Sequence, residues 1–198
     1  MSETTPSQSK PAPEKPAAPR WMLWAPLALF VAFCGLVTIG LLRPASTEVP
    51  SQMIGKPLPP FALPAAVAER PGLAAADMGL GGAGKGKPRL LNIFASWCLP
   101  CAAEAPVIAQ LAQQGAEIDG IAIRDHRADL AAFLASHGNP YTRLGADDVS
   151  AVQLAIGSSG VPETFVIDGH GIIRYQHIGD IRPEEVPMML DKLHEAEQ

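Results

Sequence analysis

Two cysteines three positions apart, in the segment FASWCLPCAAEAP at residues 94–106, restrict the possible folds more than any other feature of the chain. The compact apolar run RLLNIFA at 89–95 is typical of a buried strand. Residues 100–114 carry apolar side chains at helical spacing, and Gly115 is a stop signal. Cys98 and Cys101 are therefore predicted to lie at a junction between a strand and a helix.

Four kinds of chemistry use closely spaced cysteines, and the sequence argues against three of them. A zinc site needs a second ligand pair, whereas the chain has no other Cys pair and five scattered histidines. Haem attachment needs a histidine directly after the second cysteine, where this chain has Ala102. A purely structural disulfide over so short a loop would restrain the unfolded chain little. A redox pair remains, so neither a metal nor another cofactor is predicted.

The helix start explains how such a pair would work. Free amide groups and the helix dipole stabilise a thiolate at Cys98, and the thiolate is the species that attacks disulfides. Cys101, about one turn further along, can then resolve the mixed disulfide. Pro100 suits an early helical position and stiffens the pair.

The pattern after the cysteines alternates between strands and helices and ends in a hairpin. Such a pattern predicts an α/β domain, a mixed sheet with helices on both faces. A glycine-rich loop at 79–87 resembles a phosphate-binding loop but lacks the required Ser or Thr and leads into a strand. We expect strands at 117–123, 163–168 and 172–178, helices at 128–138, 150–156 and from Pro183 onward, and a short element around 141–144.

The N-terminal part of the chain has a different composition. Residues 1–20 are rich in Pro, Ser and Lys and are predicted to be disordered. Residues 21–42 carry no charge and are long enough for a transmembrane helix, and this length favours an uncleaved anchor over a cleaved signal peptide. The basic residues before this span favour a cytoplasmic N-terminus and an exported domain at 57–198, joined by a linker at 43–56. The net charge of −5 offers no basic surface for nucleic acid.

Several motifs together resemble a known family. LLNIFASWCLPCAAEAP, HGNPY and GVPETFVIDGHGIIRYQHIGD are similar to the thioredoxin superfamily, and within it to the DsbE/CcmG family of membrane-anchored cytochrome c maturation proteins. The resemblance implies a thioredoxin-like domain in the periplasm, held at the inner membrane by the N-terminal helix. It also implies a reductant that keeps apocytochrome c, or a thiol protein of cytochrome c maturation, reduced. A membrane electron donor of the DsbD/CcdA type would reduce the domain again.

The resemblance assigns roles to single residues. Cys98 matches the nucleophile, Cys101 the resolving cysteine and Pro162 a cis-proline that faces them. Asn92 stands where thioredoxin has a buried aspartate, so another group, a glutamate or a water, must accept the proton of the resolving thiol. By this comparison, residues 127–144 are an insertion into the thioredoxin core. The residues expected to support the pair are Trp97, Pro100, Glu104, Val161, Pro162 and Glu163.

Two other functions are compatible with the cysteine motif. One is a thioredoxin-like reductase that serves other exported clients, such as copper-site assembly proteins. The other is a module that holds a client without transferring electrons, and the presence of both cysteines argues against it. The GVPETF and GNPY segments favour the role in cytochrome c maturation.

Overall fold

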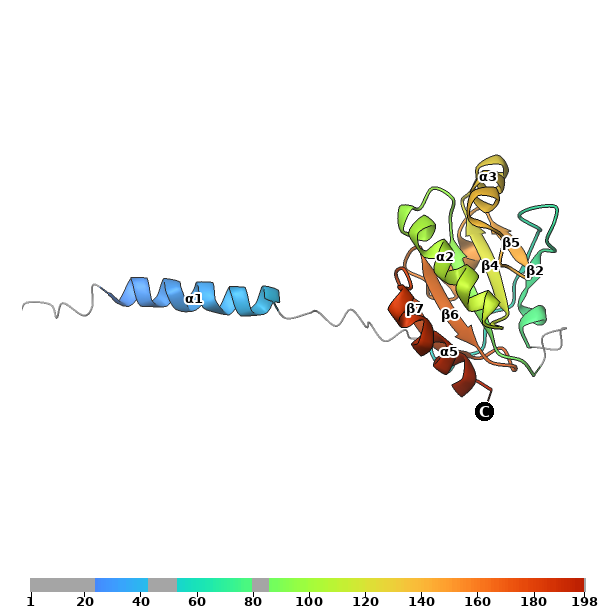
Figure 1. Cartoon of the computed structure of the whole chain (residues 1–198). Coiled ribbons are helices and arrows are strands. Elements are labelled where there is room, and N and C mark those ends of the chain that lie inside the picture. The colour runs from blue at the N-terminus through green and yellow to red at the C-terminus, as the bar shows by residue number, and fades with distance from the viewer. Residues whose placement is uncertain (1–23, 43–52, 80–85, 198) are drawn as a thin grey trace, which may run out of the picture. The chain divides into compact units, whose positions relative to one another are not determined.

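The computed structural model describes residues 24–42, 53–79 and 86–197, and the chain divides into two units, Met1–Thr47 and Glu48–Gln198. The first unit contains helix α1, Ala25–Leu42 (Figure 1). Large apolar side chains of α1, among them Leu29 and Leu36, are exposed. Within the described ranges, no helix combines the length and hydropathy needed to cross a membrane. The predicted disordered tail at 1–20 lies outside these ranges, as does most of the predicted loop at 79–87.

The second unit is built on a five-stranded mixed sheet with the strand order β5-β4-β3-β6-β7. β3, β4 and β5 run parallel to one another, and β6 and β7 complete the sheet as an antiparallel hairpin. Every residue of the central strands β3, β4 and β6 is buried, which agrees with their mostly apolar sequences, and polar residues among them such as Asn92 and Asp119 are bonded inside the protein. The strands are β3 Arg89–Phe94, β4 Ile118–Ile123, β5 Leu144–Asp147, β6 Glu163–Ile167 and β7 Ile173–Ile178.

Helices α2, α3 and α5 lie on the near side of this sheet in Figure 1. The ring of Phe94 on β3 stacks on Tyr141 and packs against Phe133 of α3, so these aromatic side chains form the core under the helices. α2 ends before Gly115, whose φ of +96° supplies the left-handed conformation that closes many helices. The helices are α2 Leu99–Gln113, α3 Arg127–His137, α4 Ala151–Ala155, α5 Val186–Glu195 and the preceding 3₁₀ turn η3 Pro183–Glu185.

The hairpin of β1 (Ala62–Leu63) and β2 (Leu73–Ala74), followed by the 3₁₀ helix η2 (Ala75–Met78), packs against β5 and β4, and the Ala66 amide donates to the Leu144 carbonyl of β5. Gly145 of β5 allows this close approach, because a Cβ there would meet the side chain of Leu63 at 2.8 Å.

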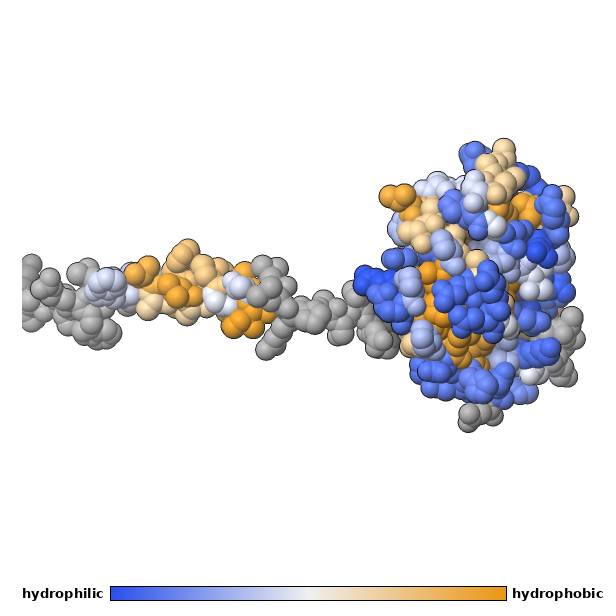
Figure 2. Space-filling model, in the orientation of Figure 1, coloured by the Kyte–Doolittle hydropathy of each residue, from blue (hydrophilic) through white to orange (hydrophobic). Residues whose placement is uncertain are grey.

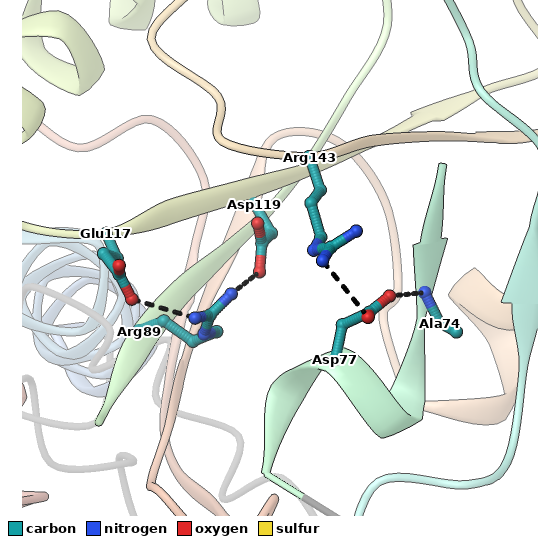
Figure 3. A network of polar contacts seen from close by, with 6 residues as sticks. All are labelled: Ala74, Asp77, Arg89, Glu117, Asp119 and Arg143. Atoms are coloured by element: carbon teal, nitrogen blue, oxygen red, sulfur yellow. Dashed lines mark hydrogen bonds and ion pairs between the residues drawn. The ribbon is translucent and has the colours of Figure 1, made fainter. Parts of the chain in front are cut away.

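Figure 3 shows the polar contacts near this layer. The guanidinium of Arg89 pairs with Asp119 and Glu117, and Asp77 of η2 accepts a hydrogen bond from the Ala74 amide and pairs with Arg143. These pairs link β3 to β4, and η2 to the segment before β5.

Most of the predicted elements are confirmed within one residue at each end. The exception is the short element expected around 141–144, because Tyr141 turns its ring into the core and β5 begins only at Leu144. The predicted linker at 43–56 lies partly outside the described residues. Its described end is bonded to the domain, since the amide of Gly55 donates to the carbonyl of Ile173 at 2.7 Å.

Candidate active site

Cys98 and Cys101 form a disulfide at the start of α2, with 5.2 Å between their Cα atoms. Cys98 is the N-cap residue, and its Sγ accepts a hydrogen bond from the Cys101 amide at 3.2 Å. Pro100 occupies the first turn, where its missing amide donor costs no helical hydrogen bond. The two cysteines are 5% and 3% exposed in this oxidised form. The predicted redox pair therefore has the helix-start geometry that stabilises a thiolate at Cys98.

Two exposed apolar side chains flank the disulfide. Trp97 is 57% exposed, and Leu99 is 82% exposed. The indole Nε1 of Trp97 donates to the Arg124 carbonyl at 3.2 Å, which fixes the ring beside the cysteine loop. Figure 2 shows apolar surface on the part of the domain where α2 begins. A second protein that reaches the disulfide would therefore meet apolar side chains first.

The peptide bond between Val161 and Pro162 is cis, which confirms the conformation predicted for this proline. The antiparallel register pairs Ile93 of β3 with Glu163 of β6. Pro162 therefore precedes β6 at the same end of the sheet from which the chain leaves β3 toward Cys98. Val161 is partly buried and packs against the core. The fold thus brings the proline and the cysteine pair to one edge of the sheet.

Glu104 lies one turn after Cys101 on α2, and its carboxylate points into the protein, where the residue is only 2% exposed. One oxygen accepts the Ile181 amide at 3.1 Å, and the other lies 3.5 Å from Nδ2 of Asn92. Burial raises the pKa of Glu104 from 4.5 to about 7; the two hydrogen bonds oppose this shift, and the charge of Asp180 adds to it. A carboxyl group that titrates near neutral pH is suited to accept and release protons.

Asn92 sits at the centre of this buried cluster. Its amide nitrogen also donates to Thr164 at 3.0 Å, and its oxygen accepts the hydroxyl of Tyr141 at 2.8 Å. Burial, with a smaller contribution from the nearby Glu104, raises the pKa of Tyr141 well above its usual value, so the phenol stays a donor. An amide therefore lies where the resemblance expects thioredoxin's buried aspartate, and the carboxyl group of Glu104 is directly beside it.

Glu163 lies next to the cis-proline but faces a different set of partners. One carboxylate oxygen accepts the backbone amides of Ser159 and Gly160 and the Ser159 hydroxyl, and the other accepts Nε2 of Gln176 at 2.8 Å. Thr164, the next residue on β6, points toward Asn92, so strand alternation turns Glu163 to the opposite face of the sheet. The structure does not bring the two glutamates together.

Sequence reasoning missed several residues that shape the site. Tyr141 and Ile181 reach the Glu104 cluster from distant parts of the chain, and only the GNPY motif hinted that Tyr141 matters. Asp125 bonds Ser96, two residues before Cys98, although in the sequence it belongs to a polar stretch at the end of a strand. Among the described side chains, no group of three or more His, Cys, Asp or Glu could hold a metal ion.

Comparisons with known proteins agree with this geometry. The redoxin family matches residues 55–193. The chain is 41% identical over 163 residues to the thiol:disulfide interchange protein DsbE of Pseudomonas fluorescens biotype C, covering 82% of this chain and 86% of that protein. It is 38% identical over 182 residues to DsbE of Escherichia coli K12, covering 87% and 95%.

A solved structure is also similar. The crystal structure of a thiol:disulfide interchange protein DsbE from Chlorobium tepidum matches with a TM-score of 0.59 at 25% identity, over 73% of this chain and 98% of that one. The fold is therefore thioredoxin-like, as the sequence predicted. With the Cys98–Cys101 disulfide in place, the chain belongs to the redoxin family and, within it, to the DsbE thiol:disulfide interchange proteins, and it is a thiol:disulfide oxidoreductase.

Proposed function

We propose that this oxidoreductase is a reductant in cytochrome c maturation, with Cys98 and Cys101 as its catalytic residues. The client is a disulfide in apocytochrome c or in a thiol protein of the same pathway. The observation that carries the proposal is the disulfide in the first turn of α2, in a chain about 40% identical to DsbE over most of its length. The resemblance of the GVPETF and GNPY segments to the cytochrome c maturation family supports this client over copper-site proteins.

The reaction starts from the dithiol form. The Cys98 thiolate, stabilised by the Cys101 amide and the helix N-terminus, attacks one sulfur of the client disulfide, and the other client sulfur leaves as a thiolate that takes up a proton. Cys101 then loses its proton and attacks Sγ of Cys98, which releases the second client sulfur as a thiolate. Two electrons pass to the client, each client thiolate takes up a proton from the solvent, and the domain is left with the Cys98–Cys101 disulfide.

Glu104 is suited to accept the proton that Cys101 loses. The two residues lie three positions apart on α2, which places them on one side of the helix. A pKa of about 7 lets the carboxylate take the proton at neutral pH and release it when the domain is reduced again. Glu163 instead supports the site by bonding Ser159 and Gly160, directly before Val161 and Pro162.

The proposed location is the periplasmic side of the inner membrane. Residues 21–42 would form the anchor, supported by their lack of charge and by the exposed apolar side chains of α1. Residues 1–20 would lie in the cytoplasm, and the linker 43–56 would lead to the catalytic domain 57–198. An electron donor of the DsbD/CcdA type in the same membrane would restore the dithiol.

A trapping experiment tests this function. Cys101→Ser removes the resolving thiol, so the mixed disulfide at Cys98 should persist and can be identified by mass spectrometry after non-reducing electrophoresis. We expect apocytochrome c or a cytochrome c maturation protein, and no adduct with the Cys98→Ser control. Trapping only copper-site assembly proteins would contradict the proposed client. Absence of any adduct with Cys101→Ser would contradict electron transfer through this pair.

A further inference from the structure

The residues directly before the cysteines form a turn that is hydrogen-bonded to a neighbouring loop. The Cys98 amide donates to the Ala95 carbonyl at 3.2 Å, so Ser96 and Trp97 are the central residues of this turn. Cys98 is both the last residue of the turn and the N-cap of α2. The direction in which α2 starts, and the place of the Cys98 sulfur, therefore depend on the conformation of Ser96 and Trp97.

Both central residues are bonded to the loop between β4 and α3. The Ser96 amide donates to one oxygen of the Asp125 carboxylate at 2.6 Å, and the Ser96 hydroxyl donates to the other oxygen at 2.6 Å. The indole of Trp97 donates to the carbonyl of Arg124, the preceding residue. Bonds to an ionised carboxylate are shorter and stronger than neutral ones, so Asp125 makes the stronger of these attachments.

The loop that carries Asp125 is itself fixed. Arg124 has a φ of +44°, a left-handed conformation that a non-glycine residue rarely adopts, and its amide donates to the Asp147 carbonyl at 3.1 Å. Asp147 is buried, and its carboxylate accepts two amides at the start of α4. Hydrogen bonds thus connect α4, through Asp147, Arg124 and Asp125, to the turn before the cysteines.

We propose that Asp125 is a positioning residue for the redox pair: it holds the Ser96–Trp97 turn so that the Cys98 sulfur meets the Cys101 amide. The proposal rests on the proposed function only in taking Cys98 as the attacking thiol. Without the carboxylate, the Ser96 amide and hydroxyl lose their acceptors, and the turn keeps the weaker of its two attachments to this loop, the bond from Trp97 to Arg124. In the structure, the Cys98 sulfur lies 3.2 Å from the Cys101 amide nitrogen. After the change, the Cys98 thiolate would lose its alignment with this amide and with the helix N-terminus.

A positioning role and a simple charge effect predict different outcomes for two variants. If Asp125 acted only through its negative charge, Asp125→Ala and Asp125→Asn would both favour the Cys98 thiolate, because each removes a negative charge nearby. If Asp125 positions the turn, only the alanine variant disfavours the thiolate. An asparagine oxygen can accept the Ser96 amide, and its NH₂ group can donate to the Ser96 hydroxyl.

The experiment measures alkylation of reduced Cys98 by iodoacetamide between pH 5 and 9, in the full chain, with the labelled peptide identified by mass spectrometry. We expect the rate at pH 7 to fall roughly 10-fold in Asp125→Ala, because small displacements of a reacting group are costly. The thiol pKa read from the profile should rise. Asp125→Asn should match or exceed the rate of the unmodified protein. Ser96→Ala keeps the bond from the Ser96 amide to Asp125 but removes the bond from the hydroxyl. It should slow alkylation by about a third to a half of the Asp125→Ala effect, on a logarithmic scale.

Equal shifts in Asp125→Ala and Asp125→Asn would overturn the positioning role, and so would unchanged profiles in Ser96→Ala and both Asp125 variants. If Asp125→Ala does not fold, as near-ultraviolet circular dichroism would reveal, the comparison of Ser96→Ala with Asp125→Asn decides: an unchanged Ser96→Ala profile then refutes the role. Failure of the proposed function would appear separately, as Cys101→Ser protein without trapped clients but with intact alkylation profiles.

Discussion

Glu104→Gln should raise the free energy of unfolding of the oxidised protein above neutral pH. Glu104 is 2% exposed, and burial raises the pKa of its carboxyl from 4.5 to about 7. The folded protein therefore keeps a proton that the unfolded chain has already released between about pH 4.5 and about pH 7. Because the unfolded state binds fewer protons in this window, the free energy of unfolding falls as the pH rises.

The size of the effect follows from the same values. A change from 4.5 to about 7 corresponds to roughly 3 kcal/mol of lost stability above pH 7, at about 1.4 kcal/mol per pH unit. Glutamine keeps an acceptor for the Ile181 amide but turns an NH₂ group toward Nδ2 of Asn92, which costs about 1 kcal/mol at any pH. The variant should therefore be about 2 kcal/mol more stable at pH 8 and about 1 kcal/mol less stable near pH 4.5.

Urea unfolding of the oxidised full chain at several values between pH 4.5 and pH 8 measures this difference. Glu69→Gln is the matched control, because the Glu69 side chain is exposed and its variant should follow the profile of the unmodified protein. Parallel profiles for Glu104→Gln and the unmodified protein across this range would refute the reasoning, since they would mean that burial does not perturb the Glu104 carboxyl. The reasoning would be supported if the Glu104→Gln variant is less stable than the unmodified protein at pH 4.5 and more stable at pH 8.

Three further predictions concern other parts of the domain. In the reduced protein, limiting iodoacetamide near neutral pH should label Cys98 before Cys101, and preferential labelling of Cys101 would reverse the assigned roles. Glu163→Gln should lower the free energy of unfolding by about 2 kcal/mol in urea, because one NH₂ group would replace an acceptor in its buried network; an unchanged midpoint would contradict this. Arg89→Met should cost about 3–5 kcal/mol by leaving Asp119 buried without its partner, and the double variant with Asp119→Leu should recover most of that loss if the pairing is the cause.

The sequence predicted the parts of the fold that depend on local pattern. The buried strand before Cys98 was recognisable because four of the six residues of β3 are large and apolar, as expected for a strand that is buried on both faces. The start of α2 was equally clear, since a proline in the first turn and a thiol at the N-cap are local signals. The cis conformation of Pro162 came from family resemblance, because no local pattern distinguishes it from a trans proline.

The parts that could not be predicted depend on contacts between distant residues. Glu163 follows the cis-proline in sequence, and the family resemblance grouped it with Glu104 among the residues that support the pair. Its direction is set by strand alternation and by Gln176, which reaches it from the neighbouring strand β7. The bonds between Ser96 and Asp125 join residues 29 positions apart, and either residue alone would pass for an ordinary polar residue in a loop.

Asn92 stands where the resemblance expects an aspartate, and the effect of this difference depends on the residues around it. Tyr141 donates to the Asn92 oxygen, which turns the Asn92 amide nitrogen toward Glu104 and Thr164. An aspartate at this position would place a second carboxylate about as close to Glu104 as the 3.5 Å that now separates amide and carboxyl, and like charges at such a distance cannot both ionise readily. An amide avoids this conflict, because it can accept from the phenol and donate to the acid at once. The carboxyl group beside Asn92 is thus that of Glu104, on the helix that begins at the two cysteines.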